Sequence, residues 1–147
     1  MNRIFYFDSV KGNYRCDAAV FSCFDHRFDL VLREFLRKND IAAPDIIKIA
    51  GGAKSLVSPD SEVERQFAFE QVRKSMRLHG TDRVILMVHS DCGAYGGLAA
   101  FKGDAAAEAE HHHREVLRAA QILSENIAGL DVRAYFADFE GVWEVAA

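Results

Sequence analysis

Short apolar runs that alternate with longer amphipathic segments constrain the fold of this chain more than any other feature. After Arg83, the run Val-Ile-Leu-Met-Val is apolar at every position, as in a strand covered on both faces. Between such runs, apolar residues recur at the three- and four-residue spacing of a helix. The pattern predicts strands at 17–23, 45–50, 83–88, 132–137 and 141–145, and helices at 28–39, between Ser61 and Gly80, and at 105–128.

The second helix has the best local evidence for its two ends. Ser61 and Glu64 form an S-x-x-E capping box, which satisfies backbone N–H groups that the first turn leaves open. Gly80 is suited to the left-handed residue that ends many helices. We therefore expect this helix to begin at Ser61 and end at Gly80.

Strands that alternate with helices indicate right-handed crossovers and a mostly parallel sheet. We predict an α/β fold: a single three-layer domain over residues 1–147, with a mostly parallel four-stranded sheet flanked by helices. The last segment, 141–145, is expected to turn back around 138–140 and add an antiparallel strand. A length of 147 residues suits one domain, and with half of its residues hydrophobic the chain can fill one core.

Composition excludes several classes of function. A net charge of −4 gives no basic stripe for nucleic acid, so we expect no nucleic-acid partner. No apolar run approaches the roughly 18 to 20 residues that span a bilayer, and no signal peptide is recognisable, so we expect no membrane partner and a cytoplasmic location. Three cysteines cannot all pair, and in a reducing compartment they are better interpreted as thiols or metal ligands.

Two short segments carry the reactive side chains. Cys23-Phe-Asp25-His-Arg27 follows the first predicted strand, and His89-Ser-Asp-Cys92-Gly93 follows the third. Parallel strands place their carboxyl ends at one edge of the sheet, where ligand sites form. Two thiolates and one imidazole are ligands that zinc favours, and three protein ligands with an open fourth position are the catalytic arrangement. The sequence therefore predicts a Zn²⁺ site at Cys23, His89 and Cys92.

Asp25 and Arg27 are the predicted catalytic residues beside that site. Zinc held by two thiolates and a neutral His has little net charge, so it acidifies its water less than zinc held by three imidazoles. Asp25 can accept a hydrogen bond from that water, and Arg27 can orient Asp25 and keep it ionised. The alternate spacing of Cys23, Asp25 and Arg27 would point all three side chains the same way if the segment is extended.

These two segments resemble the beta-class carbonic anhydrases, which carry C-x-D-x-R and H-x-x-C-G in this order. The resemblance covers about residues 18 to 98 and includes the glycine-rich turn Ala-Gly-Gly-Ala after the second strand. It implies that Cys23, His89 and Cys92 bind zinc and that Asp25 and Arg27 form the catalytic dyad. It also implies dimers or higher homo-oligomers, and, in some members, an aspartate that moves onto the zinc at lower pH.

The chain departs from the family pattern at three places. The family usually shows R-N-A-G-N in the turn where this chain has residues 48–53, and usually has Gly before the ligand His, where this chain has Val88. Many members begin with long helices that embrace a partner subunit, whereas only 22 residues precede Cys23 here. The chain is therefore interpreted as a short, divergent member of the family.

Three functions follow from this resemblance. The first is an enzyme, a zinc lyase that reversibly hydrates carbon dioxide to bicarbonate, with that small molecule as its substrate. The second uses the same zinc site to hydrolyse carbonyl sulfide or carbon disulfide, which are also linear molecules. The third is a zinc- or anion-binding module without turnover, which the altered turn at residues 48–53 and the short N-terminal region motivate.

Each of these residues also has a plain structural interpretation. Cys23 and Cys92 could be buried thiols near a hydrogen-bonded His, and Asp25 with Arg27 could be an ion pair without catalytic function. A nucleophilic role for Cys92 is disfavoured, because residues 93–98 contain no Arg to hold an anion.

Other conspicuous residues are predicted to be structural. The three histidines at 111–113 point about 100° apart on a helix, so they cannot converge on one ion, and a solvated helix face is predicted. His79 is expected to favour the dipole of its helix end. The Gly51-Gly52 pair is predicted to form a tight turn, and the aromatic residues at 5–7 are expected to be docked, with a subunit contact as an alternative. Cys16 is predicted to have no functional role.

Overall fold

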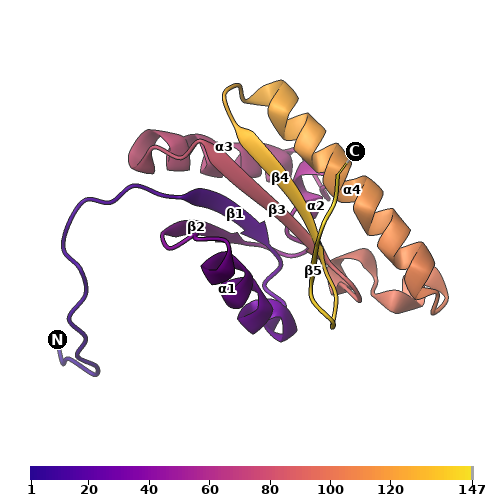
Figure 1. Ribbon diagram of the computed structural model, residues 1–147, viewed down its shortest axis with the longest axis horizontal. Coiled ribbons are helices and arrows are strands. Elements are labelled where there is room, and N and C mark those ends of the chain that lie inside the picture. The colour runs from indigo at the N-terminus through magenta and orange to yellow at the C-terminus, as the bar shows by residue number, and fades with distance from the viewer. Residues whose placement is uncertain (147) are drawn as a thin grey trace.

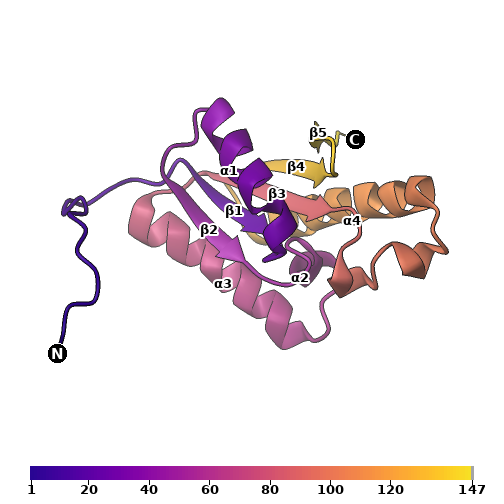
Figure 2. The same cartoon turned by 90° about the horizontal axis from the view of Figure 1, so that it is seen from below.

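A computed structural model of the chain describes residues 1–146 and contains one five-stranded sheet with helices on both faces (Figures 1 and 2). The strands are β1 (Ala18–Ser22), β2 (Pro44–Lys48), β3 (Arg83–His89), β4 (Asp131–Ala137) and β5 (Val142–Glu144). The helices are α1 (Asp29–Lys38), α2 (Lys54–Val57), α3 (Glu62–His79) and α4 (Ala105–Asn126), with 3-10 turns η1 (His26–Phe28), η2 (Gly93–Tyr95) and η3 (Leu98–Phe101).

The strands lie in the order β2-β1-β3-β4-β5. The first four are parallel, and β5 pairs antiparallel with β4 through Tyr135–Glu144, Phe136–Trp143 and Ala137–Val142. The predicted α/β fold, with four parallel strands and an added C-terminal antiparallel strand, is therefore confirmed. The short α2 helix and the 3-10 turns were not predicted.

The sheet is the middle of three layers. Helix α1 covers one face, and α2, α3 and α4 cover the other, as Figure 2 shows. The larger apolar cluster lies on the α3 and α4 side, and the smaller one lies under α1. Strand β3 runs through the centre with Val84 to His89 buried, which accounts for its unbroken apolar run. The edge strand β2 is only partly buried.

Helix ends follow the local chemistry of the sequence. The Ser61 side chain accepts a hydrogen bond from the Glu64 N–H and begins α3, and Gly80 ends it with φ +68°. Asp104 caps α4 by accepting hydrogen bonds from the N–H groups of Ala106 and Ala107. The ends predicted for α3 are confirmed, and they fix where the chain enters β3.

Two predictions about surface residues are wrong. His112, in the middle of the supposed solvated face, has 0% exposure and packs between Tyr95 and Phe136, because it lies four residues before the buried Val116 on the inner side of α4. The aromatic residues at 5–7 are not docked within the chain: they are exposed in the N-terminal segment that extends away from the sheet in Figure 1, and a subunit contact there stays a prediction.

Within residues 1–146, no helix is both long enough and apolar enough to cross a membrane.

Candidate metal centre

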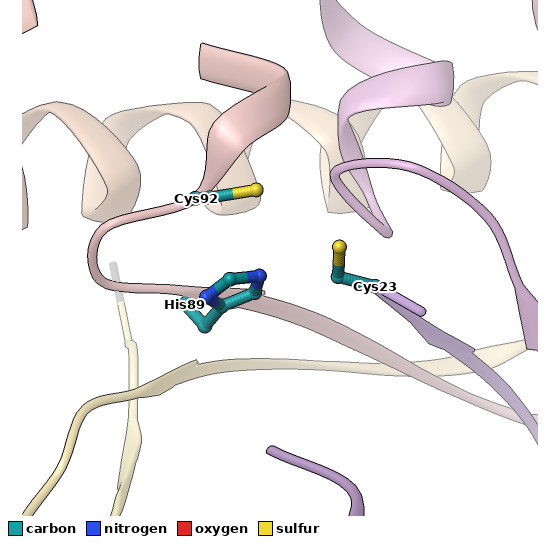
Figure 3. A group of neighbouring side chains, drawn as sticks. All are labelled: Cys23, His89 and Cys92. Atoms are coloured by element: carbon teal, nitrogen blue, oxygen red, sulfur yellow. The ribbon is translucent and has the colours of Figure 1, made fainter. Parts of the chain in front are cut away.

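Cys23, His89 and Cys92 meet at the carboxyl ends of β1 and β3. One ligand atom from each residue lies within 4.8 Å of the other two, and in the part of the chain that the structure describes this is the only such group of three. Figure 3 shows the two sulfur atoms and the imidazole ring facing a common space. His89 and Cys92 are almost fully buried, and Cys23 is partly exposed. The three predicted ligands are thus brought together.

Glycines in the turn after β2 place the backbone against Cys23. The Gly51 N–H donates a hydrogen bond to Cys23 Sγ at 3.3 Å. Gly52 has φ +57°, and a Cβ there would lie 2.4 Å from the Met87 carbonyl oxygen, so only glycine fits. The Gly51-Gly52 turn is therefore tight, as predicted, and it supplies a donor to the sulfur.

His89 is oriented for coordination through Nε2. It is the last residue of β3, and its Nδ1 donates to the Ser90 carbonyl oxygen at 2.8 Å, which leaves the lone pair on Nε2. Nε2 is buried without a hydrogen-bond partner. The Phe28 ring packs on the imidazole with centroids 4.3 Å apart, which restricts its rotation. An orphaned ring nitrogen beside two sulfur atoms is an arrangement that a metal ion completes.

The two thiols titrate as a pair. A hydrogen bond from Cys92, with further bonds from backbone N–H groups, outweighs burial and lowers the pKa of Cys23 well below that of a free thiol. The pKa of Cys92 is raised, because it donates its proton to the Cys23 thiolate and is buried beside that negative charge. The pair therefore favours one thiolate, at Cys23, over two neutral thiols. A divalent cation would compensate the charge of a second thiolate at Cys92, so the donor set fits Zn²⁺.

Asp25 and Arg27 form a multidentate ion pair beside this cluster. Arg27 Nη2 donates to Asp25 Oδ2 at 2.7 Å, and both Nε and the backbone N–H of Arg27 donate to Oδ1 at 3.1 and 3.0 Å. These bonds lower the pKa of Asp25 to about 2, so its carboxylate is ionised near neutral pH. The same contacts raise the pKa of Arg27.

The expected extended conformation of residues 23–27 is wrong. Strand β1 ends at Ser22, and Arg27 lies in the 3-10 turn η1, which Asp25 caps by accepting its N–H. The ion pair therefore forms because the chain turns back on itself, and not because alternate side chains of a strand share a face.

Sequence reasoning missed two acidic residues that are linked to this pair, one directly and one through the other. Asp91 Oδ2 accepts a hydrogen bond from Arg27 Nη1 at 2.8 Å, and the buried Glu108 accepts one from the Asp91 N–H at 2.8 Å. Asp91 stood inside the second segment, but nothing in the sequence indicates contact with a residue 64 positions earlier. The signal for Glu108 was its spacing of eight residues before Val116, on the buried side of α4.

Aromatic rings cover one side of the centre. Phe139, from the turn between β4 and β5, packs against Phe28 with centroids 5.3 Å apart and lies 5.5 Å from the Arg27 guanidinium carbon. Phe24 and Phe139 are themselves exposed. The candidate site is therefore polar at its ligands and apolar on this side.

One protein family matches residues 14–147, and its description reads "Putative carbonic anhydrase". No curated protein matches the chain.

Solved structures with the same fold are enzymes by their titles. A carbonic anhydrase from Streptococcus mutans is similar with a TM-score of 0.64 and 18% identity, over 95% of this chain and 88% of that one. An apo carbon disulfide hydrolase gives a TM-score of 0.57 and 16% identity, over 90% and 81%. A tetrameric beta-carbonic anhydrase from Sordaria macrospora gives 0.52 and 14%, over 91% and 82%. At these identities the likeness is one of fold.

Proposed function

Because the chain belongs to the beta-class carbonic anhydrase family, we propose that it is a zinc enzyme that reversibly hydrates carbon dioxide to bicarbonate. Cys23, His89 and Cys92 would hold the ion. The observation that carries this proposal is the buried sulfur–nitrogen–sulfur cluster, in which His89 Nε2 has no other partner. Zinc at such a site acts as a Lewis acid and generates a nucleophile from water near neutral pH.

The protein side chains supply orientation and charge. The ionised Asp25 carboxylate accepts a hydrogen bond from the attacking water, which directs an oxygen lone pair at the carbon of the substrate. Arg27 fixes that carboxylate through two nitrogen atoms of its guanidinium group and its backbone N–H. The Phe28 ring packs on the His89 imidazole and shields that face of the imidazole from water. Asp25 and Arg27 are therefore the proposed catalytic dyad.

Stopped-flow hydration of carbon dioxide, followed with a pH indicator, tests the proposal on protein purified without added metal. We expect about one zinc per chain. Asp25→Asn should keep the zinc and lower kcat by about 10² to 10⁴-fold, the range for loss of a general acid or base. Asp40→Asn is a matched control, since Asp40 is exposed and Asn tolerates its φ of +57° equally well. Zinc-loaded protein without turnover, or an Asp25→Asn variant as active as the wild type, would contradict the proposal.

Carbonyl sulfide and carbon disulfide are the second candidate substrates. The fold likeness to a carbon disulfide hydrolase and the exposed Phe139 ring beside the site favour them, because polarizable sulfur makes favourable contacts with aromatic rings. Sulfide release in the same preparation separates the two activities. Tight zinc with no reaction on any of the three molecules would leave a non-catalytic zinc- or anion-binding module.

We also propose that the chain assembles as a homodimer or a higher homo-oligomer. One protein of the same fold is described as tetrameric. The exposed aromatic rings at residues 5–7 offer apolar surface for a subunit contact. Light scattering on size-fractionated protein would give the mass, and a purely monomeric mass at micromolar concentration would contradict the proposal. The cytoplasmic location stays a prediction from the sequence.

A further inference from the structure

Two carboxylates hold Arg27 from opposite sides. The Asp25 carboxylate accepts hydrogen bonds from Arg27 Nε and Nη2. Asp91 accepts one from Nη1 through Oδ2 at 2.8 Å and one from Nη2 through its backbone carbonyl oxygen at 3.0 Å. Each aspartate thus accepts hydrogen bonds from two nitrogen atoms of the guanidinium group, and together they fix the orientation of its plane. Because the Arg27 side chain is 46% exposed, these contacts and the Phe139 ring are what restrain it against turning into solvent.

Asp91 is itself held in a demanding conformation. Its φ of +51° is left-handed, which Asp adopts more readily than most residues do. Its Oδ1 accepts the Leu98 N–H at 2.9 Å. Gly97 makes room for this carboxylate, since a Cβ there would lie 2.8 Å from Asp91 Oδ1. The backbone around Asp91 thus restricts its side chain to one position.

Glu108 fixes the backbone of Asp91 through a hydrogen bond. It lies in the first turn of α4, is only 2% exposed, and accepts the Asp91 N–H at 2.8 Å through Oε1. Burying a carboxyl group with a single hydrogen bond costs free energy of folding, so its position calls for a structural explanation. That bond connects the rigid helix to the loop which holds Arg27, and through Arg27 to Asp25.

We propose that Asp91 and Glu108 are positioning residues, which hold Arg27 so that the Asp25 carboxylate stays directed at the reacting water. The inference rests on the proposed function of Asp25. An exposed ion pair such as Arg27–Asp91 contributes little to folding stability, so its effect is expected in the chemical step instead. The shared chain of contacts runs from Glu108 to Asp91, from Asp91 to Arg27, and from Arg27 to Asp25.

Two readouts on the zinc-loaded protein test this chain of contacts. The first is the division of the effect between kcat and KM. The second is the NMR signal of the Arg27 Nε–H, which exchanges slowly with water while it is held and does not depend on turnover. Asp91→Asn keeps an acceptor for the Leu98 N–H but removes the charge. We expect kcat to fall about 10 to 100-fold with KM nearly unchanged, and the Arg27 signal to shift and exchange faster.

Glu108 is tested by rescue. Glu108→Ala removes the acceptor and should lower kcat in the same direction, whereas Glu108→Gln keeps an acceptor oxygen of the same shape and should restore most of it. Glu34→Ala is the matched control, because it frees Arg37 from an ion pair on α1 that has no contact with the site. It should leave kcat and the Arg27 signal unchanged.

The outcomes separate this inference from the proposed function. If Asp91→Asn keeps the wild-type kcat and Arg27 signal, or if Glu108→Gln is as impaired as Glu108→Ala, the positioning role is overturned. If the wild type turns over none of the three candidate substrates, the proposed function fails, and the Arg27 signal in the same variants still decides whether Asp91 and Glu108 hold the guanidinium. Should Glu108→Ala not fold, the Asp91→Asn signal decides.

Discussion

The two ends of the sheet use the same kinds of residue in opposite ways. At the amino end, Asp45 accepts hydrogen bonds from Ser75 Oγ at 2.6 Å and from His79 Nδ1 at 2.8 Å, and its backbone N–H donates to Cys16 Sγ at 3.1 Å. Ser75 also shares a hydrogen bond with Thr81 at 2.6 Å. Every polar side chain of this network has a partner, and His79 binds a carboxylate in addition to lying in the last turn of its helix.

At the carboxyl end the Asp25–Arg27–Asp91 network is also paired, but several buried polar atoms beside it lack partners. The buried side-chain atoms without a hydrogen bond, among residues 1–146, are Ser22 Oγ, His89 Nε2, Ser90 Oγ and both ring nitrogens of His112. All of them belong to the ends of β1 and β3 or to the part of α4 packed against Tyr95 and Phe136. Since buried polar groups are normally paired, the amino-end network is complete in itself, whereas His89 Nε2 at the carboxyl end has the surroundings of a metal ligand.

The largest test of this contrast exchanges one sulfur for oxygen at each end. Cys92→Ser should weaken zinc binding by more than about 100-fold, beyond what loss of an outer-shell partner costs, and abolish turnover, because an alcohol is a poor zinc ligand. Cys16→Ser keeps a donor to the Ala18 carbonyl oxygen and an acceptor for the Asp45 N–H, and should bind zinc like the wild type. Metal analysis after dialysis against a chelator measures both. Equal zinc content in the two variants would remove the distinction between the two ends.

His112 sharpens the contrast, because it is an orphaned histidine outside the cluster of Cys23, His89 and Cys92. Burial lowers its pKa from 6.5 to about 4, and the neighbouring His111, His89 and His113 act in the same direction. The Tyr95 ring packs on it, and Glu108 Oε1 lies 3.8 Å from its Nε2, too far for a hydrogen bond. We therefore expect His112 to be neutral in the fold and to contribute nothing to metal binding.

Its protonation makes the fold less stable in acid. Because the folded pKa lies below that of an unfolded histidine, the unfolded state binds the proton first, and stability falls as the pH drops from about 6.5 toward about 4, by about 3 kcal/mol in total. His112→Phe should remove that share of the pH dependence and keep the zinc content. Denaturant unfolding at several pH values measures it. Identical pH profiles for the wild type and His112→Phe would show that His112 titrates normally.

The elements of the fold were predictable because their causes are local. The apolar run before His89 and the Ser61 and Gly80 ends of α3 depend on residues within a few positions of one another. The three ligand residues were predictable for a related reason, since strand ends in a parallel sheet converge on one edge. Their roles as ligands still stand as a proposal.

What escaped prediction depends on contacts between distant segments. The 3-10 turn that carries Arg27 is stabilised partly by Asp91, which is 64 positions away, and no local pattern reports that pair. The burial of His112 was within reach: consecutive helix positions do point apart, but the four-residue spacing of Glu108, His112 and Val116 places all three on the inner side of α4. Because three consecutive polar residues suggested an exposed surface, this four-residue periodicity was overlooked.

The smallest expected effect probes the complete network at the amino end. Ser75→Ala leaves the Thr81 hydroxyl and one Asp45 oxygen without their shared partner, so the free energy of unfolding should fall by about 1 to 3 kcal/mol. Zinc content and kcat should not change, because this network joins α3 to the starts of β1, β2 and β3, at the end of the sheet opposite the predicted ligands. Denaturant unfolding and the hydration assay on one preparation measure both. A loss of activity without a loss of stability would mean that the amino end also serves the reaction, and that the two ends of the sheet do not divide this molecule into a structural end and a functional one.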